Sequence, residues 1–430
     1  MAHFPKPVEG SWTEHFPELG TAPVNYEDSI SPDYYELEKA AIFKQTWLNV
    51  GRIEQLPRVG SYFTKELDCV DTSIIIVRDR STVRAFHNMC RHRGNKLVWQ
   101  DYPGEEVKGT CRQFTCKYHG WRYGLDGELN FVQQESEFFD LDKADYPLVS
   151  VHCETWEGFI FVNFAAEPAE TLLDFLGEVA TGLSGYPFGE MTQTFGYRAI
   201  VGANWKLFND AFSEFYHAPV LHQNQAVASE SVKLQQFGFE ALHYDLFGDS
   251  GHGVVSTWGG MSPPKDLEMV KPIERILRSG LFGPWEQPPG VDLSELPPGL
   301  NPARHRAWGA DTFQVFPNYV ILVWERGWYL TYHYWPLAYD KHLFEGRLYF
   351  APPRNATDRM RQELAAVTFK EYALQDGNTL EATQRSLKSR AVTEFPLCDQ
   401  EILPRNLHKT VADRIRAHQA ENETVVSVAT

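Results

Sequence analysis

The sequence predicts an α+β protein in which a β-rich region precedes an antiparallel sheet with long helices on one face. Three observations predict this class. Short β-branched or aromatic runs between turn residues lie at 73–77, 83–87 and 156–164. Longer alternating or aromatic-rich runs, typical of an antiparallel sheet, lie at 242–258, 312–337 and 342–351. A helical pattern then covers 355–390, with apolar positions at Met360, Leu364, Val367, Leu374, Leu380 and Leu387.

The elements of the first half are expected in the following order. Residues 1–45, which include most of a helical pattern at 32–47, are expected to pack on the second region. The β-rich region spans 46–165, and Asp126-Gly127 within it is a strong hairpin signal. The second region spans 166–430 and opens with an amphipathic helix over 167–185 that Gly185 closes.

Three further features organise the second region. Residues 204–217 are helical in pattern, and Pro352-Pro353 ends the last predicted strand. Residues 279–302 hold six of the 26 prolines of the chain. This segment is longer than most connections without secondary structure, and such loops often form lids or entrance walls.

Composition excludes several classes of protein. The 430 residues carry a formal net charge of −17, which disfavours binding to nucleic acids and to anionic membrane surfaces. The best apolar stretch, 319–332, is interrupted by Glu325 and Arg326, so no membrane-spanning helix is expected. The N-terminus lacks a basic start followed by an apolar block, and we therefore expect a cytoplasmic protein.

Two cysteines and two histidines form a first candidate metal site. Cys90 and His92 precede Cys116 and His119, with 23 residues between the two pairs. Structural zinc and a Rieske [2Fe–2S] cluster both use two Cys and two His. Zinc sites usually pair Cys with Cys and His with His, whereas each half here contains one of each. The mixed pairing favours the Rieske cluster, with the thiolates on one iron and the imidazoles on the other.

These two motifs resemble those of Rieske non-haem iron oxygenase α subunits. The residues that carry the resemblance are Cys-x-His-Arg-Gly at 90–94 and Cys-Lys-Tyr-His-Gly-Trp at 116–121. The gap between the motifs is longer than in most of the family, and it contains Cys111. This cysteine has Phe114 where a histidine would follow, so it is left out of the ligand set.

His217 and His222 form a second candidate site. Their spacing of five residues would turn the second imidazole about 140° from the first on a straight helix, at about 100° per residue. Both can face one metal only if the helix bends or unwinds between them, and Pro219 lies in that interval. Two histidines and one carboxylate make the facial triad of non-haem Fe(II) oxygenases, which leaves positions open for O₂.

The resemblance supplies the third ligand and two catalytic residues. Asp376 opens the segment that resembles the carboxylate motif of the family, with Gln384 at its usual glutamine, and Glu381 is the rival ligand. Asp210 and Glu214 are candidate catalytic residues. Asp210 stands where the family often has Asn. Glu214 stands where the family has a carboxylate that links an iron-ligating histidine to a cluster-ligating histidine of the neighbouring subunit.

The resemblance implies the fold, the cofactors and the partners. It implies a Rieske β-domain at 46–165, a catalytic domain of the helix-grip type at 166–430, a [2Fe–2S] cluster and a mononuclear Fe(II). Glu214 would then connect His217 to His119 of an adjacent chain in a homotrimer, with or without β subunits. The electron donor would be an NAD(P)H-dependent reductase, a ferredoxin, or both.

The implied activity is that of a terminal oxygenase. The first interpretation of this activity is monohydroxylation or cis-dihydroxylation of an aromatic or other apolar compound, as in aromatic hydrocarbon catabolism. The alternatives are N- or O-demethylation or oxidation of a quaternary amine, and an electron-transfer protein without mononuclear iron. Aromatic residues that would pack an arene or enclose an ammonium group are Phe212, Phe215, Phe313, Phe316, Tyr319, Trp324 and Trp328.

Local charge suggests where the electron donor docks. Residues 90–122 contain seven basic and three acidic residues, a net charge of +4 in an acidic chain. Complementary charge steers protein partners together, so an acidic donor would dock at this segment. The alternative is that these basic side chains hydrogen-bond carbonyl groups around the cluster loops.

Overall fold

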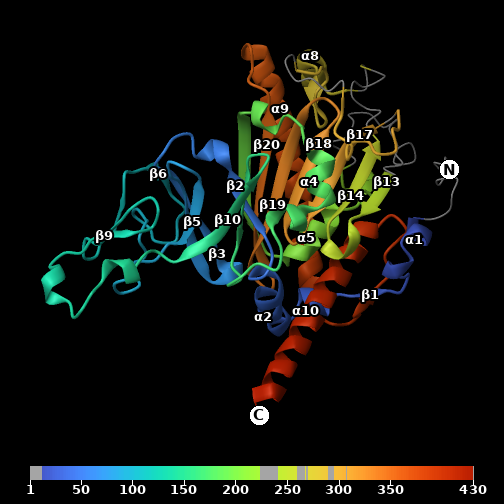
Figure 1. Cartoon of the computed structure of the whole chain (residues 1–430). Helices are drawn as coiled ribbons and strands as arrows, with labels where there is room; N and C mark the ends of the chain where they lie inside the picture. The colour runs from blue at the N-terminus through green and yellow to red at the C-terminus, as the bar shows by residue number, and fades with distance from the viewer. Residues whose placement is uncertain are drawn as a thin grey trace. The chain divides into compact units, whose positions relative to one another are not determined.

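The computed structural model describes residues 12–222, 241–258, 267, 270–288, 295–306 and 308–429. The chain separates into two compact units. One comprises Lys39–Phe175, and the other combines Met1–Glu38 with Leu176–Thr430. Figure 1 shows the first in blue to cyan and the second mainly in green to red.

The unit Lys39–Phe175 is built on antiparallel sheets. The larger sheet has seven strands, in the order β2 (Leu48–Arg52), β11 (Phe159–Asn163), β10 (Ser150–Trp156), β5 (Val83–His87), β4 (Thr72–Arg78), β3 (Ser61–Leu67) and β6 (Lys108–Thr110). A smaller sheet contains β7 (Phe114–Thr115), β8 (Arg122–Tyr123) and β9 (Leu129–Phe131). The predicted strands at 73–77 and 83–87 and the hairpin at Asp126-Gly127, which joins β8 to β9, are confirmed.

The single run predicted at 156–164 is wrong in one respect. Strand β10 ends at Trp156, and β11 begins only at Phe159. Glu157 and Gly158 both have positive φ angles, 46° and 80°, so the chain reverses there.

The second unit contains a seven-stranded antiparallel sheet. Its strands lie in the order β12 (Gln193–Val201), β20 (Lys341–Phe350), β19 (Trp328–Ala338), β18 (Tyr319–Trp324), β17 (Trp308–Val315), β14 (Gly253–Trp258) and β13 (Ala241–Leu246). Two-stranded sheets pair β1 (Val24–Asn25) with β21 (Glu394–Phe395) and β15 (Ser279–Gly280) with β16 (Gly283–Pro284). The runs predicted at 242–258 and 312–337 thus contain two and three strands, because turns divide them.

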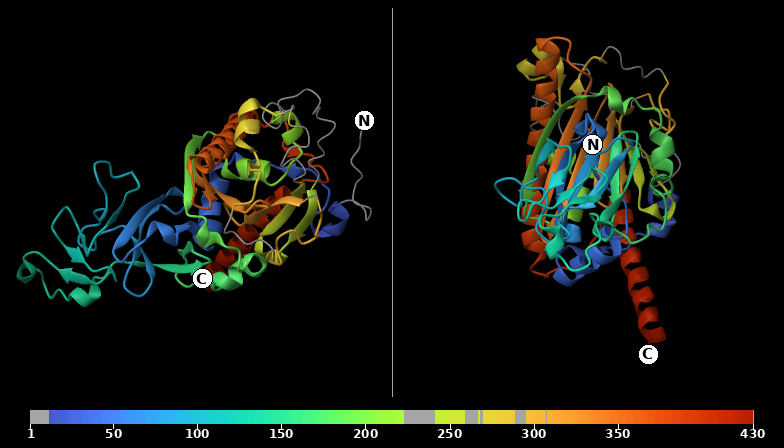
Figure 2. Two further views of the ribbon diagram at one scale, coloured as in Figure 1. Left: turned by 90° about the horizontal axis from the view of Figure 1, so that it is seen from above. Right: turned by 60° about the vertical axis from the view of Figure 1, so that its left-hand side comes forward.

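Among the described residues, the α-helices are mostly short, with two long exceptions. They are α1 (Trp12–His15), α2 (Pro32–Glu38), α3 (Leu172–Leu176), α4 (Glu178–Leu183), α5 (Trp205–Phe212), α6 (Ala218–Leu221), α8 (Pro272–Leu277), α9 (Ala356–Leu387) and α10 (Ile402–Ala429). A π-helix at Lys39–Phe43 follows α2. The end of α10 projects from the sheet and its other helices (Figure 2).

Helices α5 and α9 cover the same face of the second sheet. Phe212 of α5 contacts Tyr332, with ring centroids 4.3 Å apart, and Phe369 of α9 contacts Trp328 at 5.5 Å. Tyr332 and Trp328 point to the same face because they lie an even number of residues apart on β19. Residues near the end of α4 cover the opposite face, where Phe188 packs on Tyr329.

Several predicted helices differ from the structure. The helix predicted at 167–185 is divided into α3 and α4, because Gly177 has a positive φ of 47°. The helix predicted at 204–217 ends at Phe212. Helix α9 confirms the pattern at 355–390, although Met360, Val367 and Leu374 are exposed. Helix α10 was not predicted.

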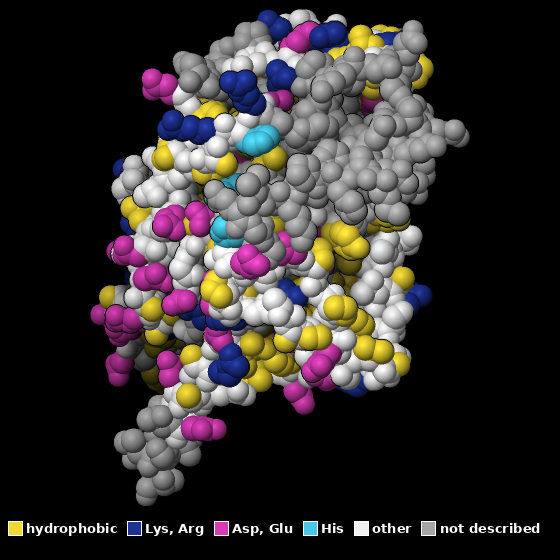
Figure 3. Space-filling model, turned by 90° about the vertical axis from the view of Figure 1, so that its right-hand side faces the viewer, with side chains coloured by type: hydrophobic (Ala, Val, Ile, Leu, Met, Phe, Trp, Pro, Cys, Tyr) yellow, Lys and Arg dark blue, Asp and Glu magenta, His cyan; other side chains and the backbone are white. Residues whose placement is uncertain are grey.

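Surface charge and helix character can be compared with the acidic composition and with the expected lack of a membrane-spanning helix. Acidic side chains gather along one flank of the face drawn in Figure 3, and several basic ones lie near its upper edge. Among the described helices, none combines the length and the apolar character that crossing a membrane requires.

Candidate metal centres

The two Cys/His motifs form loops with the same backbone design. In the first, the N–H of Gly94 donates to the carbonyl of Cys90, and the Cys90 N–H donates to the carbonyl of Asn95. In the second, Gly120 and Trp121 make the equivalent bonds with Cys116. The two glycines have φ angles of 71° and 72°, which residues with a side chain rarely adopt. Each loop therefore requires glycine four residues after its cysteine.

The loops bring the four predicted donor groups together. The thiols of Cys90 and Cys116 are buried and lie within hydrogen-bonding reach of each other. Nδ1 of His92 lies 3.2 Å from Nδ1 of His119. Two thiols on one side and two imidazole nitrogens on the other fit a cluster in which sulfur binds one iron and nitrogen the other. Cys111, which the sequence motif leaves out of the ligand set, donates a hydrogen bond from its backbone N–H to the carbonyl of Gly60.

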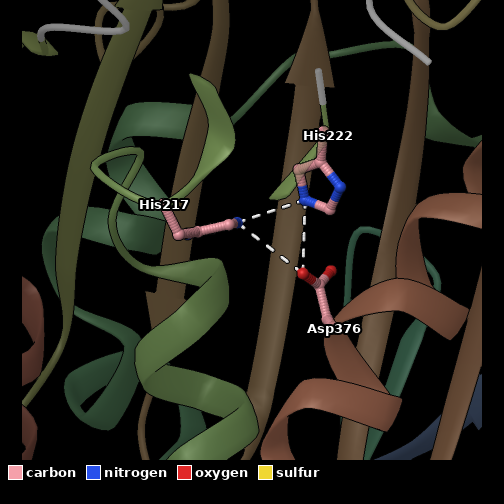
Figure 4. A group of neighbouring side chains, drawn as sticks. All are labelled: His217, His222 and Asp376. Carbon is pink, nitrogen blue, oxygen red and sulfur yellow. Dashed lines mark hydrogen bonds and ion pairs between the residues drawn. The ribbon is translucent and has the colours of Figure 1, made fainter. Parts of the chain in front are cut away.

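His217, His222 and Asp376 converge in the second unit (Figure 4). The Nε2 atoms of the two histidines lie 3.2 Å apart. Oδ1 of Asp376 lies 3.7 Å from Nε2 of His217 and 3.2 Å from Nε2 of His222. Within the described chain, this is the group of His, Cys, Asp and Glu that satisfies the geometry of a metal site with three ligands. The rival Glu381 is not a member, because its Oε1 accepts a hydrogen bond from the backbone N–H of Gly202.

The histidines converge because the helix is interrupted between them. Helix α5 ends at Phe212. The hydroxyl of the next residue, Ser213, donates a hydrogen bond to the carbonyl of Asn209, which is the acceptor that a backbone N–H would use if the helix continued. Glu214 Oε2 then accepts hydrogen bonds from the backbone N–H groups of Tyr216 and His217, which starts a new turn. The interruption lies before Pro219. That proline stands in the first turn of α6, where no N–H donor is needed.

Hydrogen bonds fix which nitrogen of each histidine faces the centre. Nδ1 of His217 hydrogen-bonds Oε1 of Glu214, and Nδ1 of His222 lies 2.7 Å from Oε1 of Gln375. Carboxylate and amide oxygens only accept, so both Nδ1 atoms carry the proton and both Nε2 lone pairs are available to a metal. Burial acts to lower the pKa of His217, but Glu214 outweighs it and raises that pKa. Gln375 was not predicted, although it directly precedes Asp376.

A carboxylate oxygen of Asp376 without a hydrogen-bond partner among the described residues indicates that the site fits an iron ion. Oδ1 of Asp376 is buried and has no hydrogen-bond partner among the described residues. A buried carboxylate oxygen without a partner is costly unless a cation binds it. It faces the two Nε2 lone pairs, and two imidazoles with one carboxylate are the donor set of non-haem Fe(II) sites. The residues therefore fit a mononuclear iron.

Asp210 lies in a buried charge network next to this centre. His408 of α10 donates from Nε2 to Oδ2 of Asp210 at 2.9 Å and from Nδ1 to Oδ2 of Asp28 at 2.8 Å. Burial acts to lower the pKa of His408, but the two carboxylates raise it to about 10. Lys206, which pairs with Glu38, and His408 together lower the pKa of Asp28 to about 2 against the effect of burial. His408 was missed because nothing local marks its partners.

Two cavities meet at the triad. One of about 90 Å³ is lined by His217, His222 and Asp376, by Glu214 and Thr257, and by apolar or aromatic side chains, of which the rings are Phe212, Phe215, Phe282, Trp324, Phe369 and Tyr372. Another of about 300 Å³ reaches Asp210 and Glu214. Of the aromatic residues predicted near a pocket, three line the smaller cavity. The other four are buried elsewhere in the unit, namely Phe313, Phe316, Tyr319 and Trp328.

The basic segment around the cluster is only partly free to meet a partner. Arg91 donates to the carbonyl of Pro147 at 2.8 Å, and Lys96 pairs with Glu66 at 2.6 Å. The contact of Arg91, and a second contact of Lys96 with the carbonyl of Pro103, agree with the alternative that basic side chains hydrogen-bond carbonyl groups. Lys117 is exposed, with its ammonium group 4.3 Å from the ring of Trp99.

Comparison with known proteins agrees with both centres. The family model described as "Ring hydroxylating alpha subunit (catalytic domain)" matches residues 188–417, and that of the "Rieske [2Fe-2S] domain" matches 46–147. The glycine betaine monooxygenase oxygenase subunit of Chromohalobacter salexigens is 36% identical over 44% of this chain and 41% of its own length. The large oxygenase component of the naphthalene 1,2-dioxygenase system of Ralstonia sp. is 30% identical over 55% and 54%. The chain thus spans about half the length of these curated relatives.

A solved structure has the same fold over nearly the whole chain. Naphthalene 1,2-dioxygenase from Rhodococcus sp. bound to indole superposes with a TM-score of 0.71 at 20% identity, covering 91% of this chain and 94% of that one. The matched domains and the triad indicate a Rieske [2Fe–2S] cluster and a mononuclear iron as the cofactors. The catalytic-domain model covers more than half of the 430 residues, and the chain therefore belongs to the family of ring-hydroxylating α subunits, with a Rieske β-domain and a catalytic domain of helices on an antiparallel sheet.

Proposed function

We propose that this chain is an oxidoreductase, the terminal component of a Rieske oxygenase system, and that it hydroxylates an aromatic or other apolar compound. The observation that carries the proposal is the triad of His217, His222 and Asp376 beside a cavity lined by aromatic rings. When bound, the two metal groups supply electron transfer and O₂ activation. The reaction adds one or two oxygen atoms of O₂ to the substrate, with electrons that originate from NAD(P)H.

Each residue of the two centres has a proposed role. Cys90, His92, Cys116 and His119 hold the [2Fe–2S] cluster, and the triad holds the iron. Glu214 and Gln375 keep the Nδ1 protons of the two histidines in place, so that the Nε2 atoms face the metal. The apolar rings of the cavity hold the substrate and exclude water from it.

Glu214 is also the proposed connection between neighbouring chains. Through Oε1 it contacts His217, and it lines the cavity of about 300 Å³. We propose that it meets His119 of an adjacent copy in a homotrimer, with or without β subunits. A reductase, a ferredoxin, or both would deliver electrons, and the exposed Lys117 belongs to the surface that an acidic donor would meet.

The domain limits and the location belong to the same proposal. We propose residues 46–165 as the Rieske domain and 166–430 as the catalytic domain, with 1–45 packed on the latter. In the compact units, residues 39–45 and 166–175 group with the β-rich unit instead. A cytoplasmic location remains a prediction from the sequence.

A second candidate function is demethylation or oxidation of a quaternary amine. The relative from Chromohalobacter salexigens favours it by its name, and aromatic rings like those of the cavity also bind ammonium groups. The other alternative is an electron-transfer protein without mononuclear iron. It does not explain why Oδ1 of Asp376 is buried without a hydrogen-bond partner among the described residues.

Product analysis under ¹⁸O₂ tests the activity. The metal-loaded chain is supplied with a surrogate reductase, NADH and a panel of arenes and quaternary amines, and the products are analysed by mass spectrometry. Incorporation of ¹⁸O into an arene supports the first function, and formaldehyde release from an amine supports the second. Electron transfer without any oxygenated product from a chain shown to carry iron at both centres would contradict both.

Glu214→Gln tests the connecting role. Glutamine keeps an oxygen that can cap the turn at His217, so both metal centres should remain filled, while turnover should be lost. Glu371→Gln, on the exposed side of α9, is the matched control and should retain activity. Normal coupled turnover of Glu214→Gln would disprove the assignment.

A further inference from the structure

Two hydrogen-bond donors in the wall of the smaller cavity have no partner. Trp324 on β18 and Tyr372 on α9 both line this cavity, and each is only 8% exposed. Nε1 of Trp324 and the hydroxyl of Tyr372 are buried, and neither has a hydrogen-bond partner among the described residues. The two side chains flank Phe369, with ring centroids 5.8 Å and 6.4 Å from it.

A neighbouring tryptophan that does not line the cavity has its donor satisfied. Trp328 stacks on Trp324 at 5.3 Å, and its Nε1 donates to the carbonyl of Phe282 at 3.2 Å. A buried donor without a partner is rare and costs free energy, so it is usually satisfied by a molecule that is not part of the chain. Two such donors, on two side chains that line one cavity, are groups that acceptor atoms of its occupant could satisfy.

The charges of the cavity restrict the kind of acceptor. Among its described lining residues there is no Lys or Arg, and the carboxylates are Glu214 and Asp376. These two negative charges already balance a divalent metal, so an anionic substrate group would lack a counter-charge. A quaternary ammonium group offers no acceptor and would leave both donors unsatisfied.

We propose that Trp324 and Tyr372 determine specificity by donating hydrogen bonds to a neutral acceptor oxygen, such as a carbonyl, on an aromatic substrate. The inference rests on the proposed function only in assuming that this cavity holds the substrate. It selects arenes that carry a polar substituent over plain hydrocarbons and over quaternary amines.

The size of the cavity guides the choice of probe. A volume of about 90 Å³ corresponds to roughly six to nine water-sized positions, at about 10–15 Å³ for each. Acetophenone and α-methylstyrene have the same heavy-atom skeleton of one ring and a three-atom substituent. They differ in that one has a carbonyl oxygen where the other has a methylene group. Comparison of the two therefore isolates the hydrogen bond from the apolar contacts.

The test is a binding measurement on the full chain with both metal centres loaded. Dissociation constants of the two probes are measured anaerobically by calorimetry for the wild type, Trp324→Phe, Tyr372→Phe and Trp328→Phe. The readout is the dissociation constant of α-methylstyrene divided by that of acetophenone, because general damage to the fold affects both probes alike. Each of the first two variants should lower this ratio about three- to tenfold, as expected for one lost hydrogen bond. Trp328→Phe, the matched control, should leave the ratio unchanged.

Several outcomes would overturn the inference. If the ratio is unchanged in either Trp324→Phe or Tyr372→Phe, that side chain does not donate to the substrate, and the proposed pair of donors is refuted. Tighter binding of benzoate or of phenyltrimethylammonium than of acetophenone would refute a neutral acceptor. Binding requires no turnover, so a chain that discriminates as expected but never oxygenates would disprove the proposed function alone.

Discussion

At the scale of single residues, loss of His408 should cost considerable stability. Its imidazolium donates to Asp28 and Asp210, and replacement by glutamine leaves Asp210 without this counter-charge and Asp28 with Lys206 alone. Removal of one partner from a buried ion pair typically costs about 3–5 kcal/mol. Urea unfolding should show this loss for His408→Gln, whereas His418→Gln on the same helix, where the side chain is half-buried, should change little. A loss below 1 kcal/mol, on the order of one surface hydrogen bond, would contradict the network.

The stabilisation by His408 should depend on pH. Its pKa is about 10 in the folded protein against 6.5 for the free side chain. A group whose pKa is raised by folding stabilises fully below its unfolded pKa and loses that contribution as pH rises through the folded value. The difference in unfolding free energy between wild type and His408→Gln should therefore be greatest near pH 6 and decline toward pH 10. A difference that grows over this range would refute the assignment.

At the scale of elements, one substitution should have opposite effects in a helix and in a loop. Gly377 lies inside α9, and the nearest side-chain atom to an added Cβ would be Cγ2 of Val201, at 3.8 Å. Gly377→Ala should therefore stabilise the chain by about 0.5–1 kcal/mol. Gly94 has a φ of 71°, so Gly94→Ala should destabilise its loop by about 1–2 kcal/mol. Urea unfolding measures both, and loss of iron from Gly377→Ala would show that the glycine serves the metal instead.

The elements also show where the sequence suffices. The Cys/His loops were predictable because each is closed within six residues. The spacing of His217 and His222 correctly required an interruption of the helix, but its position depends on hydrogen bonds of Ser213 and Glu214 that spacing does not reveal. Asp376 came from the family resemblance, because it lies 154 positions after His222 in the chain. Helix α10 escaped prediction because its contacts, such as His408 with Asp28, join residues 380 positions apart.

At the scale of the whole molecule, the metal centres should be lost separately. The cluster ligands lie in the unit Lys39–Phe175 and the triad lies in the other unit. Asp376→Ala should reduce the iron content from about three to about two per chain and leave the visible spectrum of the cluster intact. His92→Ala should leave about one iron, because the cluster contains two. Iron analysis and absorption spectra measure both, and loss of all iron from either variant would show that the centres depend on each other.

The fold class was predictable at this scale because the periodicity of strands and of α9 is local. The division into units was less predictable from the sequence. Met1–Glu38 groups with Leu176–Thr430, although the whole β-rich unit separates these two segments in the chain. Contacts such as Trp205 with Glu38 hold this segment, and they depend on tertiary packing rather than on pattern.

The origin of Trp324 has a consequence for how this protein can evolve. Trp324 comes from strand β18, whereas the triad comes from α9 and from the turns around α6. Mutations along the strand can alter which molecule fits without displacing a ligand atom. Under the proposed function, substitutions in the sheet would therefore change which substrate is accepted while the metal ligands stay in place.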